Sequence, residues 1–377
     1  MAAGDVNAVL DTFREVLSDP DGVARDWKEQ GKRVVGYRCI YVPEDIIWAA
    51  DMLPYPLYGT PEPIGLADAY FQSCSCEFVR NIFDHALAGR YSFLDHLVLA
   101  NTCEFSRGLF ALWDTYVKGI PVYMVNNPLK LMDDSNRDYY RAELERFKAA
   151  MEQLSGTAVS NDRLRDSIAL HNETRSLLKQ LYSLRKQDPP AITGEEALEI
   201  VLATSLLPKD RANPLLRQLL EGVKVREVPD SSGPRLLVTG SIMDNAVLIR
   251  MVEEEGGQVV ADDLCTTTKY FWNQVPNHED PIEALYRFEN GRHLCTCTHP
   301  MEARLEHLQQ LIDEFAVEGI IYFNLKYCHP LAYEAPIVKE EFEGKGIQSI
   351  ILEVGHDMSG HGQLRTRIQA FIEMLEL

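Results

Sequence analysis

The sequence predicts an α/β fold in which two parallel-sheet domains of the Rossmann or flavodoxin type flank a helical segment. Short apolar strands alternate with amphipathic helices in the first and last thirds of the chain, a pattern typical of parallel sheets. The middle third has long, charged, amphipathic segments without a strand pattern. We therefore expect an N-terminal α/β domain over 1–134, a helical segment over 135–230 and a C-terminal α/β domain over 231–377.

The N-terminal domain contains the clearest strand of the chain. Residues 97–100, Leu-Val-Leu-Ala, form a continuous apolar run of the kind that is buried on both faces of a parallel sheet. The strands predicted here are 33–37, 97–100 and 120–125. Pro43 suits the first turn of a helix, and Glu44 and Asp45 complement its positive end. Residues 53–56 are expected to end this helix and lead into a short connection.

The remaining elements follow from the same patterns. The helices predicted in the middle segment are 136–154, 160–186 and 193–206. Thr193 and Glu196 fit a capping box, and the charged runs of this segment are interpreted as solvated helix faces. The strands predicted in the C-terminal domain are 236–240, 258–263, 319–324 and 347–353, and its helices are 245–255, 301–317 and 364–377.

Composition limits the possible functions. Hydrophobic residues make up 46% of the 377 residues and charged residues 25%, as in soluble globular proteins. The net charge of −20 argues against binding to nucleic acid or to a membrane surface. The N-terminus carries acidic residues early and has no signal-peptide pattern, so we expect a cytoplasmic protein. No glycine-rich phosphate-binding motif follows a strand, so no nucleotide is expected on this chain.

The cysteines point most directly to chemistry. They are Cys39, Cys74, Cys76, Cys103, Cys265, Cys295, Cys297 and Cys328. Thiols this sparse are expected to stay reduced in the cytosol, and any single one can be a small buried hydrophobe. Several of them, however, follow a predicted strand or precede a predicted helix. Because open α/β sheets bind ligands beyond the carboxyl ends of their strands, these thiols are expected to face a crevice.

Cysteine spacing alone leaves the ligand of these thiols open. Thiolates from distant loops suit an iron–sulfur cluster, a zinc ion or a redox dithiol. Zinc sites usually contain cysteine pairs with two to four residues between them. Here the close pairs, Cys74 with Cys76 and Cys295 with Cys297, have a single residue between them, which also differs from the C-x-x-C of thioredoxin-like proteins.

The chain resembles the family of 2-hydroxyacyl-CoA dehydratase subunits and the related benzoyl-CoA reductase subunits. The matching segments are VVGYRCIYVPEDIIWAADMLP, the helix start at Cys76 with Arg80, LVLANTCEF, VVADDLCTTTKYF, GIIYFNLKYCHP and GQLRTRIQAFIEML. They occur in the family's order over nearly the whole chain. The resemblance implies parallel α/β domains, a [4Fe–4S] cluster, electrons from a separate ATP-hydrolysing iron–sulfur activator, and an acyl-CoA substrate.

The resemblance also assigns roles to individual cysteines. Cys76, Cys103 and Cys328 match the most general cluster ligands of the family. Cys39, Cys265 and Cys295 match cysteines of only some members, which resemble double-cubane cluster proteins that bind an [Fe8S9] cluster. Cys74 and Cys297 are alternates as metal ligands.

Three functions remain open at this stage. The first is the iron–sulfur subunit of an ATP-dependent radical enzyme of the benzoyl-CoA reductase or 2-hydroxyacyl-CoA dehydratase type, paired with a homologous subunit or a second copy of itself. The second is a homodimeric double-cubane reductase of small molecules, and the third is a scaffold that has lost its cluster. The candidates for catalytic side chains are Glu104 and His329, although many family members carry Asp in place of Glu104.

Overall fold

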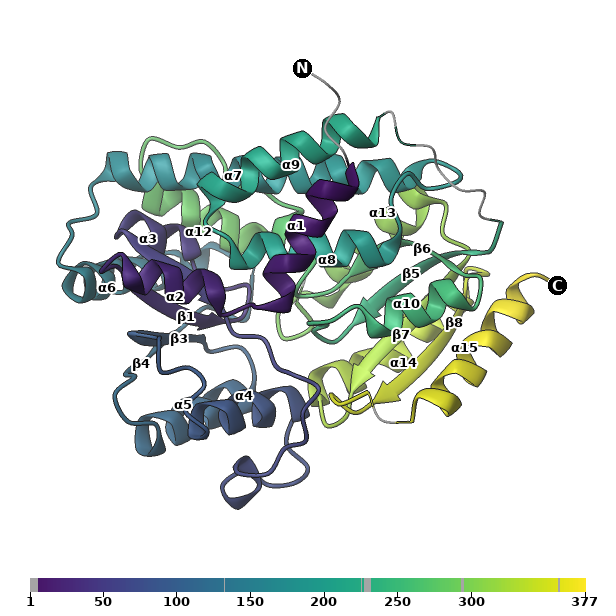
Figure 1. The fold of residues 1–377 in the computed structure, drawn as a ribbon, viewed down its shortest axis with the longest axis horizontal. Helices are drawn as coiled ribbons and strands as arrows, with labels where there is room; N and C mark the ends of the chain where they lie inside the picture. Colours follow the sequence, from purple (N-terminus) through teal and green to yellow (C-terminus); the bar gives the residue numbers. More distant parts are fainter. Residues whose placement is uncertain (1–5, 132, 225, 227–231, 293–294, 359) are drawn as a thin grey trace.

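The computed structural model describes residues 6–131, 133–224, 226, 232–292, 295–358 and 360–377. It contains two four-stranded sheets, and the neighbouring strands within each sheet run parallel. Figure 1 shows the sheets beside each other, with long helices from the middle third of the chain lying across both. The predicted fold class, two parallel α/β units with a helical segment between them in sequence, is therefore confirmed.

The first sheet is buried on both faces. Its strands are β1 (Arg33–Arg38), β2 (Met52–Pro56), β3 (His96–Ala100) and β4 (Val122–Val125). The helices of this part are α2 (Gly22–Glu29), α3 (Glu44–Ala49), η1 (Ala67–Ala69), α4 (Glu77–Leu87) and α5 (Glu104–Tyr116). Val34 and Leu97 belong to the core that includes α4 and α5, whereas the adjacent Val35 and Val98 belong to the core that includes α3. Successive side chains of a strand point to opposite faces, so apolar residues must follow one another, as they do here.

Strand β2 corrects the expectation that residues 53–56 only end a helix. It pairs with β1 from Arg33 opposite Met52 to Tyr37 opposite Pro56. Its prolines cannot donate hydrogen bonds to a neighbouring strand, and proline is therefore tolerated in edge strands. Because β2 lies at the edge of its sheet, pairing with β1 overrides the local proline signal.

The second sheet repeats the topology of the first. Its strands are β5 (Arg235–Gly240), β6 (Gln258–Asp263), β7 (Gly319–Leu325) and β8 (Gln348–Val354). The helices of this part are α10 (Val247–Glu254), α11 (Thr268–Phe271), α12 (Pro281–Gly291), α13 (Met301–Phe315), α14 (His329–Glu343) and α15 (His361–Leu375). The strand orders β2-β1-β3-β4 and β6-β5-β7-β8 are equivalent. In each sheet the second strand is added on one side of the first and the later strands on the other, so a switch point lies beside β1 and beside β5. Ligands of doubly wound sheets bind at such switch points.

The helical part contacts both sheets. Its helices are η2 (Asp134–Asn136), α6 (Arg137–Ser155), α7 (Asn161–Ser183), η3 (Leu184–Lys186), α8 (Gly194–Leu206) and α9 (Lys209–Val223). The predicted capping box of Thr193 and Glu196 is present at the start of α8. The first helix, α1 (Val6–Ser18), packs on α8 and α9, and α12 packs on α6. Helices from outside the middle segment thus pack on it, and the domain boundaries expected from the sequence stay a prediction. No helix among the described residues is long and apolar enough to cross a membrane.

Two arginines of the helical part are buried, so the interpretation of its charges as solvated helix faces was wrong for them. Arg175 of α7 binds Asp45 of α3, with Nη2 3.0 Å from Oδ2. Arg185 of η3 binds Asp262 of β6 at 2.8 Å, and both side chains are fully buried. The hydroxyl of Tyr182 also donates to Asp262. These ion pairs connect the helical part to the first sheet's α3 and to the second sheet itself.

Replacing Asp262 with alanine is expected to destabilise the protein by about 3–5 kcal/mol, because Arg185 would remain buried without a counter-charge. The shift in the urea midpoint, followed by far-UV circular dichroism, measures this loss. Glu314→Ala is the control, since it breaks the exposed pair with Lys186 and should cost less than about 1 kcal/mol. Equal shifts in the two variants would contradict the importance of the buried pair.

Candidate metal centre

A cavity of about 100 Å³ lies where the carboxyl ends of both sheets meet. Cys39 follows β1 and Cys103 follows β3 of the first sheet, whereas Cys265 follows β6 and Cys328 follows β7 of the second. We call this space the cysteine cavity. The cysteines that line it are Cys39, Cys76, Cys103, Cys265, Cys295, Cys297 and Cys328. Thiols from both sheets therefore face one another, as the strand-end argument predicted for each sheet separately.

The first set of predicted ligands stands at helix N-termini. Cys76, Cys103 and Cys328 are the N-cap residues of α4, α5 and α14. The positive end of a helix stabilises a thiolate, which is the form that binds metal. A hydrogen bond from Cys328 lowers the pKa of Cys76 to about 6, and Arg38 and backbone amides of α4 add to this effect against the opposing effect of burial.

The second set of predicted ligands lies in loops. Burial raises the pKa of Cys39 to about 12, and burial also raises the pKa of Cys265. A hydrogen bond from Cys297 lowers the pKa of Cys295 to about 6, and the backbone N–H of Cys297 donates to Cys295 Sγ at 3.4 Å. Cys39 also has a φ of 95°, a left-handed conformation that costs energy for a residue other than glycine.

The two alternates separate in space. Cys297 lines the cysteine cavity, whereas Cys74 is exposed and is not among the described residues that line it. The Cys74 thiol donates a hydrogen bond to Gln72 Oε1, at 3.7 Å. The role of every cysteine as a ligand stays a prediction, but only Cys297 of the two alternates has the position for it.

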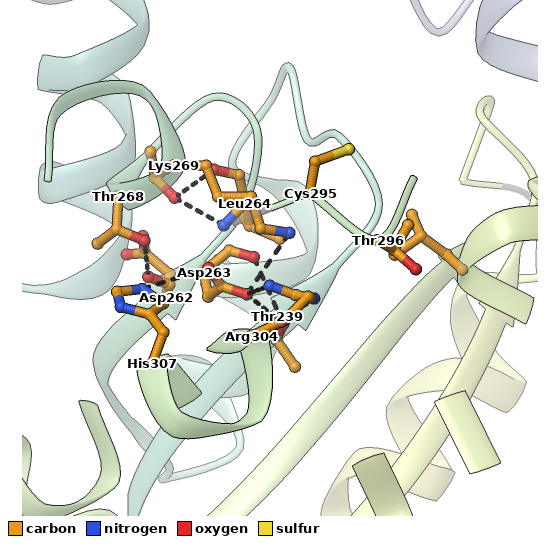
Figure 2. Close-up of polar contacts among 12 residues, drawn as sticks. Thr239, Asp262, Asp263, Leu264, Thr268, Lys269, Cys295, Thr296, Arg304 and His307 are labelled. Carbon is orange, nitrogen blue, oxygen red and sulfur yellow. Dashed lines mark hydrogen bonds and ion pairs between the residues drawn. The ribbon is translucent and has the colours of Figure 1, made fainter. Parts of the chain in front are cut away.

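A buried charge network lies behind Cys265 and was not found from the sequence. Arg304 donates to Asp263 at 2.7 Å, and Lys269 Nζ is 3.5 Å from the same carboxylate (Figure 2). Arg304 also binds Glu334 of α14. Burial opposes ionisation of Asp263, but Arg304 and Lys269 lower its pKa well below the usual range. Asp263 and Lys269 belong to a segment that matches the family, yet nothing in the sequence pairs them with Arg304.

The two candidate catalytic residues meet each other next to the cysteine cavity. His329 Nδ1 is 3.2 Å from Glu104 Oε1, and both side chains are about half exposed. They start α14 and α5, directly after Cys328 and Cys103. Neither is among the described residues that line the cavity. The structure therefore brings the pair together, while its catalytic role stays a prediction.

A smaller cavity of about 50 Å³ adjoins the cysteine cavity. The residues that line both spaces are Arg38, Cys39, Ile242 and Cys265. Its far side is polar: the Tyr37 hydroxyl donates to Glu44 at 3.3 Å, and the Tyr58 hydroxyl lies 2.6 Å from Ser205 Oγ. A single water molecule needs about 10–15 Å³ of cavity volume, so the smaller cavity can hold a molecule of only a few non-hydrogen atoms.

The donor atoms of the cysteine cavity are of the type that binds iron–sulfur clusters. No three His, Cys, Asp or Glu side chains of the described residues are close enough to hold one metal ion. The sulfurs instead surround a space, and the described lining contains no carboxylate. Soft thiolates arranged around such a space are the ligand type of iron–sulfur clusters, and the cluster itself stays a prediction.

Fold and cavity together define a class of protein, one with two parallel α/β sheets whose strand ends enclose a thiol-lined space. A family model described as "2-hydroxyglutaryl-CoA dehydratase, D-component" matches residues 39–375, so the chain belongs to this family. The resemblance seen in the sequence is thereby confirmed.

Relatives of known name match over almost their full length. The Escherichia coli protein YjiM, whose name describes a dehydratase subunit, is 30% identical over 98% of this chain and 99% of its own. One of the subunits of benzoyl-CoA reductase from Thauera aromatica is 26% identical over the whole of both chains. The beta subunit of (R)-phenyllactyl-CoA dehydratase of Clostridium sporogenes is 24% identical over 96% of this chain and 97% of its own.

The two half-buried thiols Cys295 and Cys265 should differ in reactivity in iron-free protein. Because its pKa is lowered, Cys295 should react with iodoacetamide with a midpoint near pH 6, whereas Cys265, with its raised pKa, should stay slow up to about pH 8. Mass spectrometry of tryptic peptides measures both rates. Cys297→Ala removes the thiol donor but keeps the backbone N–H donor, and it should move the Cys295 midpoint upward; an unchanged midpoint would contradict the role of the thiol.

Proposed function

We propose that this chain is the iron–sulfur subunit of an ATP-dependent, low-potential enzyme that acts on acyl-CoA thioesters, with its cluster in the cysteine cavity. The observation that carries the proposal is that the cysteines of both sheets line one space. The names of the relatives, which are subunits of acyl-CoA dehydratases and of benzoyl-CoA reductase, support the substrate class and both reaction types.

The chain's own residues have distinct tasks in this proposal. Cys76, Cys103 and Cys328 hold the cluster from the N-termini of α4, α5 and α14, and the lowered pKa of Cys76 favours its thiolate form. The bound cluster would supply single electrons at low potential. Apolar lining residues such as Phe78 and Leu331 keep water away from the sulfurs.

The proposal requires partners. A separate ATP-hydrolysing iron–sulfur activator delivers the electrons, since this chain carries no glycine-rich phosphate-binding motif. A homologous second subunit, or a second copy of this chain, completes the enzyme, in keeping with the relatives' names as subunits. The cytoplasm suits the proposal because it keeps free thiols reduced.

Cys103→Ser should lower the iron and acid-labile sulfide of anaerobically purified protein to a small fraction of the wild-type content, because it removes an N-cap thiol of the cavity. Cys74→Ser is the matched control, as this thiol is exposed and should leave the iron content unchanged. Colorimetric iron and sulfide assays on both variants measure the effect. Full iron content in Cys103→Ser would refute the assignment.

A second candidate is a homodimeric double-cubane reductase of small molecules. It is favoured by Cys39, Cys265 and Cys295, which line the same cavity as the first set. The adjoining cavity of about 50 Å³ supports a small substrate, since an acyl-CoA is far larger than a few water molecules.

Iron stoichiometry separates the two candidates. A single [4Fe–4S] cluster gives about four irons per chain and a double cubane about eight. In the double-cubane case, Cys265→Ser should lower the iron content markedly, because this thiol would be a ligand. If the wild-type protein contains about four irons and Cys265→Ser retains them, the double-cubane candidate is refuted and the acyl-CoA function stands.

A further inference from the structure

Arg38 lies between the cysteine cavity and the smaller polar cavity. It is the last residue of β1, it directly precedes Cys39, and its side chain lines both the cysteine cavity and the smaller polar cavity. Its guanidinium carbon lies 5.7 Å from the centre of the Phe78 ring. A permanent positive charge is thereby held at the wall of the thiol-lined space.

The charged surroundings of Arg38 in the cysteine cavity are sulfurs rather than carboxylates. The sulfurs of Cys39, Cys76 and Cys103 line the same cavity as Arg38. No Asp or Glu is found among the described residues lining this cavity. The buried Nε of Arg38 has no hydrogen-bond partner in the described part of the chain. Its charge is thus directed at the cysteines of the first sheet.

The carboxylates of the smaller cavity are held by other cations. Asp45 binds Arg175 at 3.0 Å, and Glu289 binds Arg292 at 3.0 Å. Glu44 lies 3.9 Å from Lys209 Nζ and accepts from the Tyr37 hydroxyl. Each of these acids therefore already has a positive partner apart from Arg38.

The other cation of the cysteine cavity differs in this respect. Lys269 lies 3.5 Å from Asp263, and Arg304 also binds Asp263 (Figure 2). Arg304 binds Glu334 as well. The positive charges on the side of the second sheet are thus balanced by carboxylates. At the first sheet, no carboxylate among the described lining residues of the cysteine cavity balances Arg38, so its positive charge acts on the group that the sulfurs bind.

We infer that Arg38 compensates the negative charge of the cluster and raises its midpoint potential; this inference rests on the proposed function. Thiolate ligands give the cluster site negative charge, and each added electron makes it more negative. A cation nearby stabilises the reduced state more than the oxidised state, and burial strengthens this effect. Arg38 acts on the cluster through its positive charge and makes no bond to substrate.

Three variants test the inference. Arg38→Gln removes the charge, Arg38→Lys keeps it, and Arg107→Gln removes an exposed arginine of α5 that does not line the cavity. Iron and sulfide are counted first on anaerobically purified protein. The midpoint potential is then measured by dye-mediated titration with EPR detection. We expect wild-type iron content in all three, a more negative midpoint in Arg38→Gln, and a midpoint close to wild type in Arg38→Lys and Arg107→Gln.

The outcomes keep the two claims apart. An iron-loaded Arg38→Gln with the wild-type midpoint, or with the same shift as Arg107→Gln, overturns the inference and leaves the proposed function intact. If Arg38→Gln binds no iron, a loaded Arg38→Lys supports the need for positive charge, whereas loss of iron in both overturns it. Wild-type protein without iron overturns the proposed function and the inference with it.

Discussion

Buried ion pairs between the helical part and the two α/β parts determine where the strand ends lie. Arg175 joins α7 to α3 at the first sheet, and Arg185 joins η3 to β6 in the second. A buried charge that loses its partner is strongly destabilising, so these contacts tolerate little rearrangement. The cysteine cavity is built from loops of both sheets and therefore depends on this fixed arrangement.

Each of the two cysteine sets combines thiols of different acidity. In the first set, a hydrogen bond from Cys328 lowers the pKa of Cys76 to about 6, whereas the same hydrogen bond and burial raise the pKa of Cys328. Cys39 and Cys265 of the second set are held as neutral thiols by burial. Cys295, the third member of the second set, has a pKa lowered to about 6 by its hydrogen bond from Cys297, so the second set also contains a sulfur that favours the thiolate form.

The charges around the cavity are arranged unevenly. Carboxylates accompany Lys269 and Arg304 at the second sheet, whereas Arg38 lines the cysteine cavity together with Cys39, Cys76 and Cys103 at the first. Iron–sulfur potentials respond to net charge, hydrogen bonds to sulfur and solvent exposure, and all three vary across this space. The polar cavity beside Cys39 and Cys265 adds room for a small molecule, and Arg38 lines it as well as the thiol-lined space.

The sequence by itself determined the alternation of strands and helices, the capping box of α8 and the position of thiols at strand ends, because apolar periodicity and helix caps are local properties. Only the tertiary structure decided that Pro54 and Pro56 belong to an edge strand, that Cys297 faces the cavity while Cys74 does not, and that Asp45 meets Arg175 across 130 residues. Such pairings arise when distant segments are buried together, and the free energy of burying a charge or a thiol depends on neighbours that no local window contains.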